Sequence, residues 1–486
     1  MTVVIPEIVW RLADVIFIVN IFLAMVVVVF ERRNPTSTLT WILLLFFMPI
    51  LGFLLYIFIG QSLRREKRFH LKEEEEQVVR PLLARQDAGL HENSLTFNDP
   101  RARHYQDLIH LQLKGNYSLL TQDNKVELFS EGDELFRRML ASLKGAKSYI
   151  HMEYYIIRND SLGRLVMRVL AEKARAGVEV KLLYDGMGCI WLNRSFFKEL
   201  LQAGGQTAEF FPPFLPYVNI RINFRNHRKI CIVDGQEAYV GGFNIGDEYR
   251  GLSPRFGYWR DLHLSIKGSA IDTLEMRFLL DWRFASGELL SAKDKYFPAR
   301  RVEGITAVQI VSSGPDLTYE SIKYGYLKLI DKARRSVYIQ TPYFIPDDSI
   351  LDALKISALS GVDVRLMLPY KPDHACVHWA SLSYVGKLLE AGVRCYLYKR
   401  GFLHSKLIVA DGFAGTVGTA NLDVRSFDFN FEVNAFIYDR EIGSQLEDLF
   451  LRDLDDCVEI TWEAYSNRPL SARVKEGIFR LLSPVL

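Results

Sequence analysis

The chain has 486 residues, of which 49% are hydrophobic and 24% charged, so it can bury more than one core and shows no compositional sign of extensive disorder. Its formal net charge of +2 excludes the strongly basic footprint typical of proteins that bind nucleic acids. The five cysteines form no Cys-x-x-Cys pair, which fits a reducing compartment and predicts no structural disulfide.

Two apolar stretches lie within the first 60 residues. Residues 39–59 carry no charged side chain, and a helix of that length would cross about 30 Å of hydrocarbon. Residues 15–30 are also uncharged, and they reach the same length when the stretch is extended back to residue 8, past Arg11 and Asp14. The sequence therefore predicts a two-helix transmembrane hairpin, with helices at about 8–30 and 39–59.

A polar segment, residues 61–118, follows the predicted hairpin, and we interpret it as a juxtamembrane linker. It begins with four cations, whereas the connection between the two apolar stretches has only Arg32 and Arg33. This bias predicts that the rest of the chain lies in the cytoplasm, and the four cations could also contact anionic lipid headgroups. The cations are Arg64, Arg65, Lys67 and Arg68. A cleaved signal peptide is the alternative for the first stretch, but no small-residue cleavage site precedes the second.

One pattern, His-x-Lys-x4-Asp, occurs twice, beginning at His227 and at His404. Each copy continues through a glycine to an asparagine, Asn244 or Asn421, and 177 positions separate both the two histidines and the two asparagines. Further stretches upstream of the two motifs also match each other. Such a constant spacing indicates an internal duplication, and we place its two lobes at residues 119–300 and 301–486.

The residues after each histidine alternate between polar and apolar as in a strand that ends at a glycine turn. Lys229 and Lys406 would share a strand face with the histidines. Asp234 and Asp411 end the two strands, a position that favours a structural role for these motif residues. Farther along, residues 259–264 match residues 430–435, and each of these stretches places one carboxylate at the shared position. Those carboxylates, Asp261 and Glu432, are the candidate partners of the histidines.

Two histidines and two lysines supply what phosphodiester transfer needs: a nucleophile, a proton donor for the leaving alkoxide, and cations around a charged transition state. A neighbouring carboxylate can fix the tautomer of each imidazole. We expect Lys229 and Lys406, with Asn244 and Asn421, to hold the non-bridging phosphate oxygens. Metal ions perform that task in many phosphoryl-transfer enzymes. Since these side chains would perform it here, we expect no metal and no other cofactor.

The paired motifs resemble those of the phospholipase D superfamily, and residues 241–249 and 421–427 look like those of bacterial cardiolipin synthases. The resemblance covers residues 119–486. Residues 34–41, 49–52 and 56–60 resemble the N-terminal region of the same synthases. The resemblance implies an α/β fold of two homologous lobes whose pseudo-twofold relation brings the motifs face to face.

The same resemblance implies a reaction at the bacterial cell (inner) membrane by a multi-pass protein. A phosphatidyl group would pass from one phosphatidylglycerol to a histidine, with release of glycerol, and then to a second phosphatidylglycerol. Analogy with relatives makes His227 the nucleophile. The expected partners are phosphatidylglycerol and anionic membrane lipid, with no nucleic acid, and a homo-oligomer is left open. The alternatives are a phospholipase D that uses water, a transferase that uses another alcohol, and a silent scaffold.

Two further features have no assigned role. Residues 210–217 are rich in aromatic residues and proline, and they could either dip into a lipid interface or pack on the second lobe. His374 and His378 are one helical turn apart and could be two metal ligands, although no third ligand is evident and packing is the other interpretation.

Overall fold

The computed structural model describes residues 73–212, 223–288, 294–300, 304–481 and 483, together with 15, 17–22, 39, 42–43 and 45–48. The chain divides into two compact units. One comprises Met1–Leu63 with Phe211–Phe224, and the other comprises Arg64–Phe210 with Arg225–Leu486. Of the stretch rich in aromatic residues and proline, residues 210–217, only residues 210–212 are described, because residues 213–222 lie outside the described residues.

The described residues include no helix that is long and apolar enough to cross a bilayer. The prediction of a two-helix transmembrane hairpin is therefore wrong, although most of residues 8–30 and 39–59 lie outside the described residues. An uncharged run has the composition of a spanning helix, but spanning also requires about 20 residues in one continuous helix.

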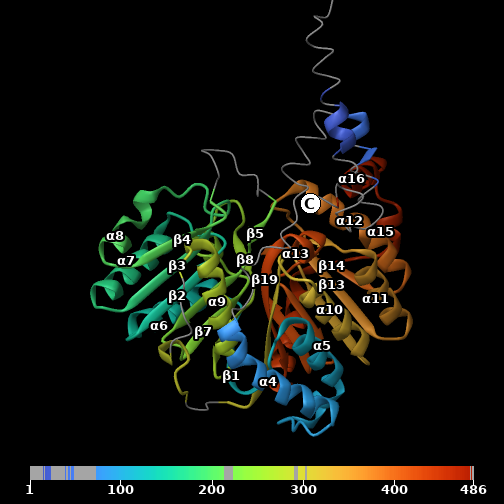
Figure 1. The fold of residues 1–486 in the computed structure, drawn as a ribbon. Helices are drawn as coiled ribbons and strands as arrows, with labels where there is room; N and C mark the ends of the chain where they lie inside the picture. The colour runs from blue at the N-terminus through green and yellow to red at the C-terminus, as the bar shows by residue number, and fades with distance from the viewer. Residues whose placement is uncertain are drawn as a thin grey trace, which may run out of the picture. The chain divides into compact units, whose positions relative to one another are not determined.

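One sheet of 16 strands runs through the second unit: 15 follow one path, and β5 (Arg225–Asn226) pairs with β19 off that path (Figure 1). The first half contributes β1 (Thr121–Phe129), β2 (Tyr149–Tyr154), β3 (Glu179–Asp185), β4 (Gln206–Phe210), β6 (Lys229–Val233), β7 (Glu237–Gly241) and β9 (His263–Lys267). The second half contributes β10 (Thr306–Ser313), β11 (Ser336–Gln340), β13 (Asp363–Pro369), β14 (Arg394–Tyr398), β16 (Leu407–Ala410), β17 (Ala414–Gly418), β19 (Asn430–Tyr438) and β20 (Cys457–Ile460).

The strand order repeats in the two halves. Reading outward from the centre, the first half runs β1-β9-β7-β6-β2-β3-β4 and the second runs β10-β19-β17-β16-β11-β13-β14, with β20 added at the edge. The halves join through the antiparallel pair β1–β10. The motif strands β6 and β16 thus occupy equivalent places, and the two-lobed α/β fold predicted from the duplication is confirmed.

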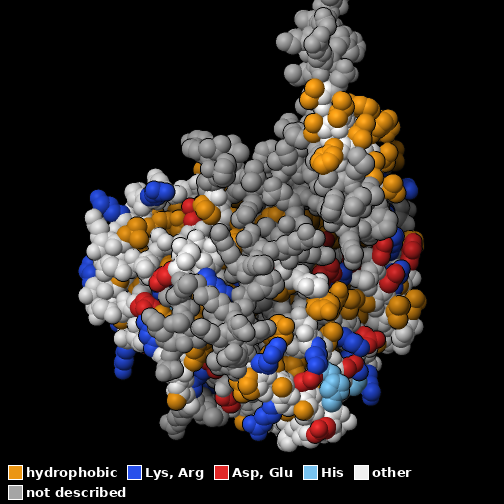
Figure 2. Space-filling view, in the orientation of Figure 1, with side chains coloured by type: hydrophobic (Ala, Val, Ile, Leu, Met, Phe, Trp, Pro, Cys, Tyr) orange, Lys and Arg blue, Asp and Glu red, His pale blue; other side chains and the backbone are white. Residues whose placement is uncertain are grey.

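Helices cover the sheet, and Figure 1 shows α6 to α8 around the first half and α10 to α12 around the second. The helices are α4 (Glu73–His91), α5 (Gln106–Asn116), α6 (Gly132–Gly145), α7 (Ser161–Arg175), α8 (Lys198–Gln202), α9 (Ala270–Ser286), α10 (Ser321–Lys332), α11 (Asp348–Leu359), α12 (Ala375–Glu390), α13 (Val424–Asp428), α14 (Arg440–Asp453), α15 (Trp462–Ser466) and α16 (Leu470–Leu481). Charged side chains of both signs are in view, in keeping with the nearly equal numbers of basic and acidic residues (Figure 2).

The same local signals build the parallel crossover in each half. Asp160 caps α7 by accepting from Gly163 N–H at 3.0 Å, and Asp347 caps α11 by accepting from Ile350 N–H at 3.1 Å. Gly177 follows the first helix with a φ of +86°, a left-handed conformation that suits glycine. Each helix then leads into a strand that is parallel to the preceding one.

The segment predicted to be a linker contains two helices that pack on the second half. Leu108, Ile109 and Leu113 of α5 are buried in the same apolar cluster as α10 residues of the second half. Gln112 also donates to the carbonyl of Ser321 at 2.9 Å. Residues 106–116 are therefore part of the folded body, and the proposed boundaries at 118 and 300 stay a prediction.

Candidate active site

Each motif histidine directly follows a short strand that pairs with the other half: β5 (Arg225–Asn226) precedes His227, and β15 (Gly401–Leu403) precedes His404. The other short strands are β8 (Tyr258–Arg260), β12 (Phe344–Ile345) and β18 (Leu422–Asp423). β5 pairs with the start of β19, and β15 pairs with β8. At the ends of these pairs, the His227 N–H donates to the Phe431 carbonyl at 2.9 Å and the His404 N–H donates to the Arg260 carbonyl at 2.7 Å. The backbone of each half therefore positions the histidine of the other.

The imidazoles and carboxylates are paired crosswise. His227 Nδ1 lies 3.0 Å from both carboxylate oxygens of Glu432, and His404 Nδ1 lies 2.6 Å from Asp261 Oδ2. All four side chains are buried. Engagement of Nδ1 fixes the ring and leaves Nε2 as the atom available to a substrate.

The two lysines lie in the same buried site. Lys229 Nζ donates to the His227 carbonyl at 2.6 Å, and Lys406 Nζ makes the equivalent bond to the His404 carbonyl. Burial lowers the pKa of Lys229 to about 7, although Glu432 opposes this, and the charge of Lys406 lowers it further. Burial lowers the pKa of Lys406 to about 8, while Asp261 and Glu432 act to raise it. These mutual effects show that both cations and both carboxylates share one site.

The surroundings of both histidines favour the neutral imidazole. Burial lowers the pKa of His227 to about 4, against the opposing charge of Glu432. Burial and the charge of Lys406 likewise lower the pKa of His404. The pKa of Asp261 is also lowered: burial acts to raise it, but the charge of Lys406 and the hydrogen bond from His404 outweigh that effect. A neutral imidazole beside an ionised carboxylate is the form that can attack phosphorus.

The predicted phosphate ligands Asn244 and Asn421 are buried beside the motifs, and both already have protein partners. Asn244 Oδ1 accepts from Ile156 N–H at 3.1 Å, and its Nδ2 donates to Tyr249 Oη at 3.2 Å. Asn421 Nδ2 donates to Asp423 at 3.3 Å, and its Oδ1 has no hydrogen-bond partner in the described part of the chain. Their role toward phosphate stays a prediction, and the contacts are those of residues that shape the site.

Asp234 and Asp411 lie at the far ends of the motif strands and bind backbone. Asp234 accepts from three consecutive N–H groups, of Lys147, Ser148 and Tyr149, at 2.7–2.9 Å. Asp411 accepts in the same way from Arg334, Arg335 and Ser336. Both aspartates have a positive φ, 53° and 56°, which non-glycine residues rarely adopt. They clamp the loops that lead into β2 and β11.

Several residues around the histidines have no signal in the repeated pattern. The ring of Tyr155 lies 4.8 Å from that of His227, and the ring of Trp259 lies 5.1 Å from that of His404. Arg228 is fully buried and donates to Asp281 at 2.6 Å and to the Glu432 carbonyl at 3.1 Å. It occupies the x of the first His-x-Lys, where the second copy has serine, so the repeat itself could not identify it.

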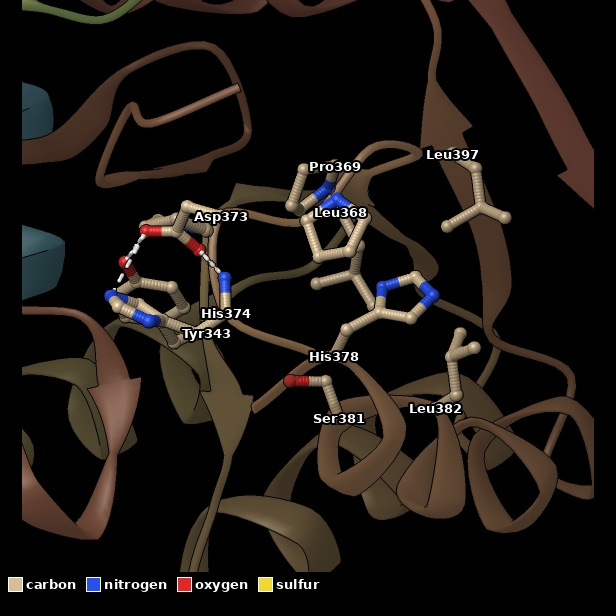
Figure 3. A pocket seen from close by; sticks show the side chains of 11 residues that line it. Tyr343, Leu368, Pro369, Asp373, His374, His378, Ser381, Leu382 and Leu397 are labelled. Carbon is tan, nitrogen blue, oxygen red and sulfur yellow. Dashed lines mark hydrogen bonds and ion pairs between the residues drawn. The ribbon is translucent and has the colours of Figure 1, made fainter. Parts of the chain in front are cut away.

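The two histidines considered as metal ligands, His374 and His378, do not converge. Figure 3 shows His374 beside Asp373 and Tyr343, whereas the ring of His378 lies in a small pocket with Leu368 and Leu397. His374 Nε2 is 3.8 Å from Asp373 Oδ2.

Among the described residues, the metal-ligating side chains that come together in a group of three are Asp87, His91 and His110, with ligand atoms within 4.8 Å of one another. The Oδ2 atom of Asp87 already accepts a hydrogen bond from Lys114 Nζ at 2.6 Å. This ammonium competes with a metal ion for the carboxylate.

Two like lobes whose paired histidines and lysines meet in one buried site define a phospholipase D-like protein. The family model described as "Cardiolipin synthase, PLD-like domain" matches residues 139–252 and 326–454, and "Phospholipase_D-nuclease N-terminal" matches residues 18–61. The chain belongs to the cardiolipin synthase family of the phospholipase D superfamily.

The similarity to individual relatives extends over nearly the whole chain. The chain is 48% identical over 476 residues to "Major cardiolipin synthase ClsA" of Bacillus subtilis, and the match covers 98% of this chain and 99% of that protein. It is 47% identical over 473 residues to a cardiolipin synthase of Listeria monocytogenes, covering 97% and 98%. A solved phosphatidylserine synthase of Haemophilus influenzae covers 80% of this chain and 100% of its own, with a TM-score of 0.61 and 14% identity, so it shares the fold.

The clamp geometry predicts that Asp411→Ala reduces stability rather than removing a catalytic group. The change leaves three backbone N–H groups without their acceptor, and we expect it to lower the free energy of unfolding by about 1–3 kcal/mol in chemical or thermal denaturation. Asp411→Asn is the control, because it keeps an acceptor and tolerates the positive φ. Full stability combined with lost activity in Asp411→Ala would contradict this assignment.

The crosswise pairing predicts which residues are energetically coupled. In double-mutant cycles on thermal unfolding, His227→Ala with Glu432→Gln, and His404→Ala with Asp261→Asn, should each show a coupling of about 0.5–3 kcal/mol. The pairs within one half, His227 with Asp261 and His404 with Glu432, are the controls and should be nearly additive. Stronger coupling within halves would show that each lobe builds its own pair.

The lowered lysine pKa values predict proton uptake when a phosphodiester binds. At pH 8 Lys229 is mostly neutral and Lys406 about half charged, and an anionic ligand favours the charged form of both. Titration calorimetry of a short-chain phosphatidylglycerol in two buffers of different ionisation enthalpy should show this uptake at pH 8. The contribution of the lysines to this uptake should fade below pH 6, where both are already charged, and the uptake at pH 8 should decrease in Lys229→Gln. Binding without proton exchange at pH 8 would contradict the lysine assignment.

Proposed function

We propose that the protein is a membrane phosphatidyltransferase that joins two phosphatidylglycerol molecules into cardiolipin and releases glycerol. Relatives named cardiolipin synthase, about 47–48% identical over nearly the full length, support this reaction. The observation that carries the chemistry is the crosswise pairing of His227 with Glu432 and of His404 with Asp261. It assembles two oriented imidazoles and two lysines in one buried site.

In the first step, His227 Nε2 attacks the phosphorus of the donor lipid. A P–N bond forms, the P–O bond to the headgroup glycerol breaks, and His404 donates its proton to the departing oxygen. The negative charge of the bound phosphodiester favours the protonated form that His404 needs for this task. Lys229 and Lys406 neutralise the non-bridging oxygens as charge accumulates on them.

The second step reverses the roles of the second histidine. His404, now neutral, accepts a proton from a glycerol hydroxyl of the acceptor phosphatidylglycerol, whose oxygen attacks phosphorus and breaks the P–N bond. Glu432 and Asp261 keep the imidazoles oriented throughout, and the lysine ammonium groups supply the charge stabilisation. The scheme uses no metal step.

Substrates and product are membrane lipids, so we propose that the protein acts at the bacterial cell membrane. The cations between residues 64 and 68 would contact anionic headgroups on the cytoplasmic side. Residues 119–300 and 301–486 remain the proposed lobes, in agreement with the repeated strand order.

Mass spectrometry of lipids after incubation of the purified protein with phosphatidylglycerol in membranes tests the proposed reaction. We expect cardiolipin and glycerol in equal amounts, and a loss of at least about 1000-fold in His227→Ala and in His404→Ala. The nucleophile variant should form no trapped phosphohistidine, whereas the other variant should retain it. Phosphatidic acid as the main product would indicate transfer to water instead, and trapping in both variants would contradict the two-step scheme.

A further inference from the structure

Cardiolipin formation places a requirement on the site that hydrolysis does not. The acceptor phosphatidylglycerol attacks through one end of its glycerol and carries its own phosphodiester at the other end. That second phosphate does not react, but its negative charge must lie one glycerol away from the phosphorus that does. Water and free glycerol bring no such charge, so a cation site that holds it would distinguish a lipid acceptor from either of them.

Two arginines from different halves of the chain lie on segments beside the start of β19. Arg225 on β5 lies opposite Asn430 in the parallel pairing with β19. Arg425 lies on α13, and its carbonyl accepts from Phe429 N–H at 3.0 Å, one residue before Asn430. In Figure 1, β5 and α13 both adjoin the region where β19 begins. Both arginines therefore flank the start of the strand that carries Glu432, the partner of His227.

Electrostatic effects agree with this placement. Burial lowers the pKa of Arg425, and the positive charge of Arg225 lowers it further, so the two guanidinium groups act on each other. Both charges also act on Tyr155, whose ring lies 4.8 Å from that of His227. Arginine binds phosphate through two parallel hydrogen bonds, so two half-buried guanidinium groups on neighbouring segments suit such an anion.

Two buried carboxylates are close enough to influence these arginines, and both are also held by backbone. Asp185 accepts from the N–H groups of Met187, Gly188 and Asn226 at 2.8–2.9 Å. Asp423 accepts from Ser426 N–H at 2.6 Å, and burial raises its pKa to about 6. These acids moderate the positive charge of the arginine pair.

The arginines also break the symmetry of the duplication. Arg225 lies two residues before His227, where the other half has Phe402 before His404, and Arg425 lies four residues after Asn421, where the other half has Glu248. The histidines, lysines and carboxylates of the transfer step occur in both halves. Arginines that occur in only one half of the duplication suit a reaction whose two lipid substrates bind at different positions.

We propose that Arg225 and Arg425 bind the non-reacting phosphodiester of the acceptor phosphatidylglycerol and thereby direct the phosphatidyl group to a lipid rather than to water. This inference rests on the proposed cardiolipin synthase function, which it deepens by assigning the acceptor site.

The test compares two reactions of the full-length protein in phosphatidylglycerol vesicles. One is cardiolipin formation, and the other is exchange of labelled free glycerol into phosphatidylglycerol, which uses the same donor step with an acceptor that has no phosphate. In Arg225→Gln and Arg425→Gln we expect cardiolipin formation to fall about 10- to 100-fold, while exchange stays within about threefold of the wild-type rate. The ratio of phosphatidic acid to cardiolipin should rise, and Arg425→Lys should restore part of the loss.

Arg168→Gln, on the exposed face of α7, is the matched control and should change neither reaction. An equal fall of both reactions in the arginine variants would overturn the proposal, because the arginines would then serve the reacting phosphate or the fold. Unchanged cardiolipin formation would overturn it as well. If the wild-type protein makes no cardiolipin, the proposed function fails first, and the wild-type assay alone shows this.

Discussion

The exchange of carboxylates between the two halves is the interaction on which the active site depends. His227 is oriented by Glu432 and His404 by Asp261, so neither half contains a complete catalytic pair. The β1–β10 join and the short strand pairs β5–β19 and β8–β15 hold the halves in the register that this exchange needs. A duplicated chain thereby becomes one catalytic unit, because separating the halves would leave buried charges without partners.

Burying this many charges is costly unless each is paired, and the surroundings of the site reflect that constraint. Arg228, next to His227, binds Asp281 and also the carbonyl of Glu432. Arg260, next to Asp261, binds Asp453 at 3.0 Å and the carbonyl of Asp261 at 2.9 Å. Each of the two carboxylates that orient a histidine therefore lies on backbone fixed by a buried arginine. Burial lowers the pKa values of both lysines despite the nearby carboxylates, and a bound phosphate would favour their charged forms.

The sequence predicted the parts of the site better than their connections. Regular spacing identified the two His-Lys pairs, and matching strands identified Asp261 and Glu432 as carboxylates near them. The sequence could not show that each histidine is paired with the carboxylate of the other half, because equivalent positions in a repeat do not specify which copy faces which. The packing of α5 was missed because its many polar residues dominate the composition of residues 61–118, although Leu108, Ile109 and Leu113 have helical spacing. The membrane hairpin was wrongly predicted from uncharged length, which does not establish a continuous helix.

Symmetry explains both the strength and the limit of these predictions. Repeated residues are those that both halves need, and they stand out because they recur. The proposed reaction, however, requires one histidine to attack and the other to transfer protons, with a donor and an acceptor lipid in different places. Identical motifs cannot supply that difference, so it must come from positions where the halves diverge. Arg228 opposite Ser405, Arg225 opposite Phe402 and Arg425 opposite Glu248 are such positions. Residues absent from the repeat are therefore where the specificity of a duplicated transferase should be sought.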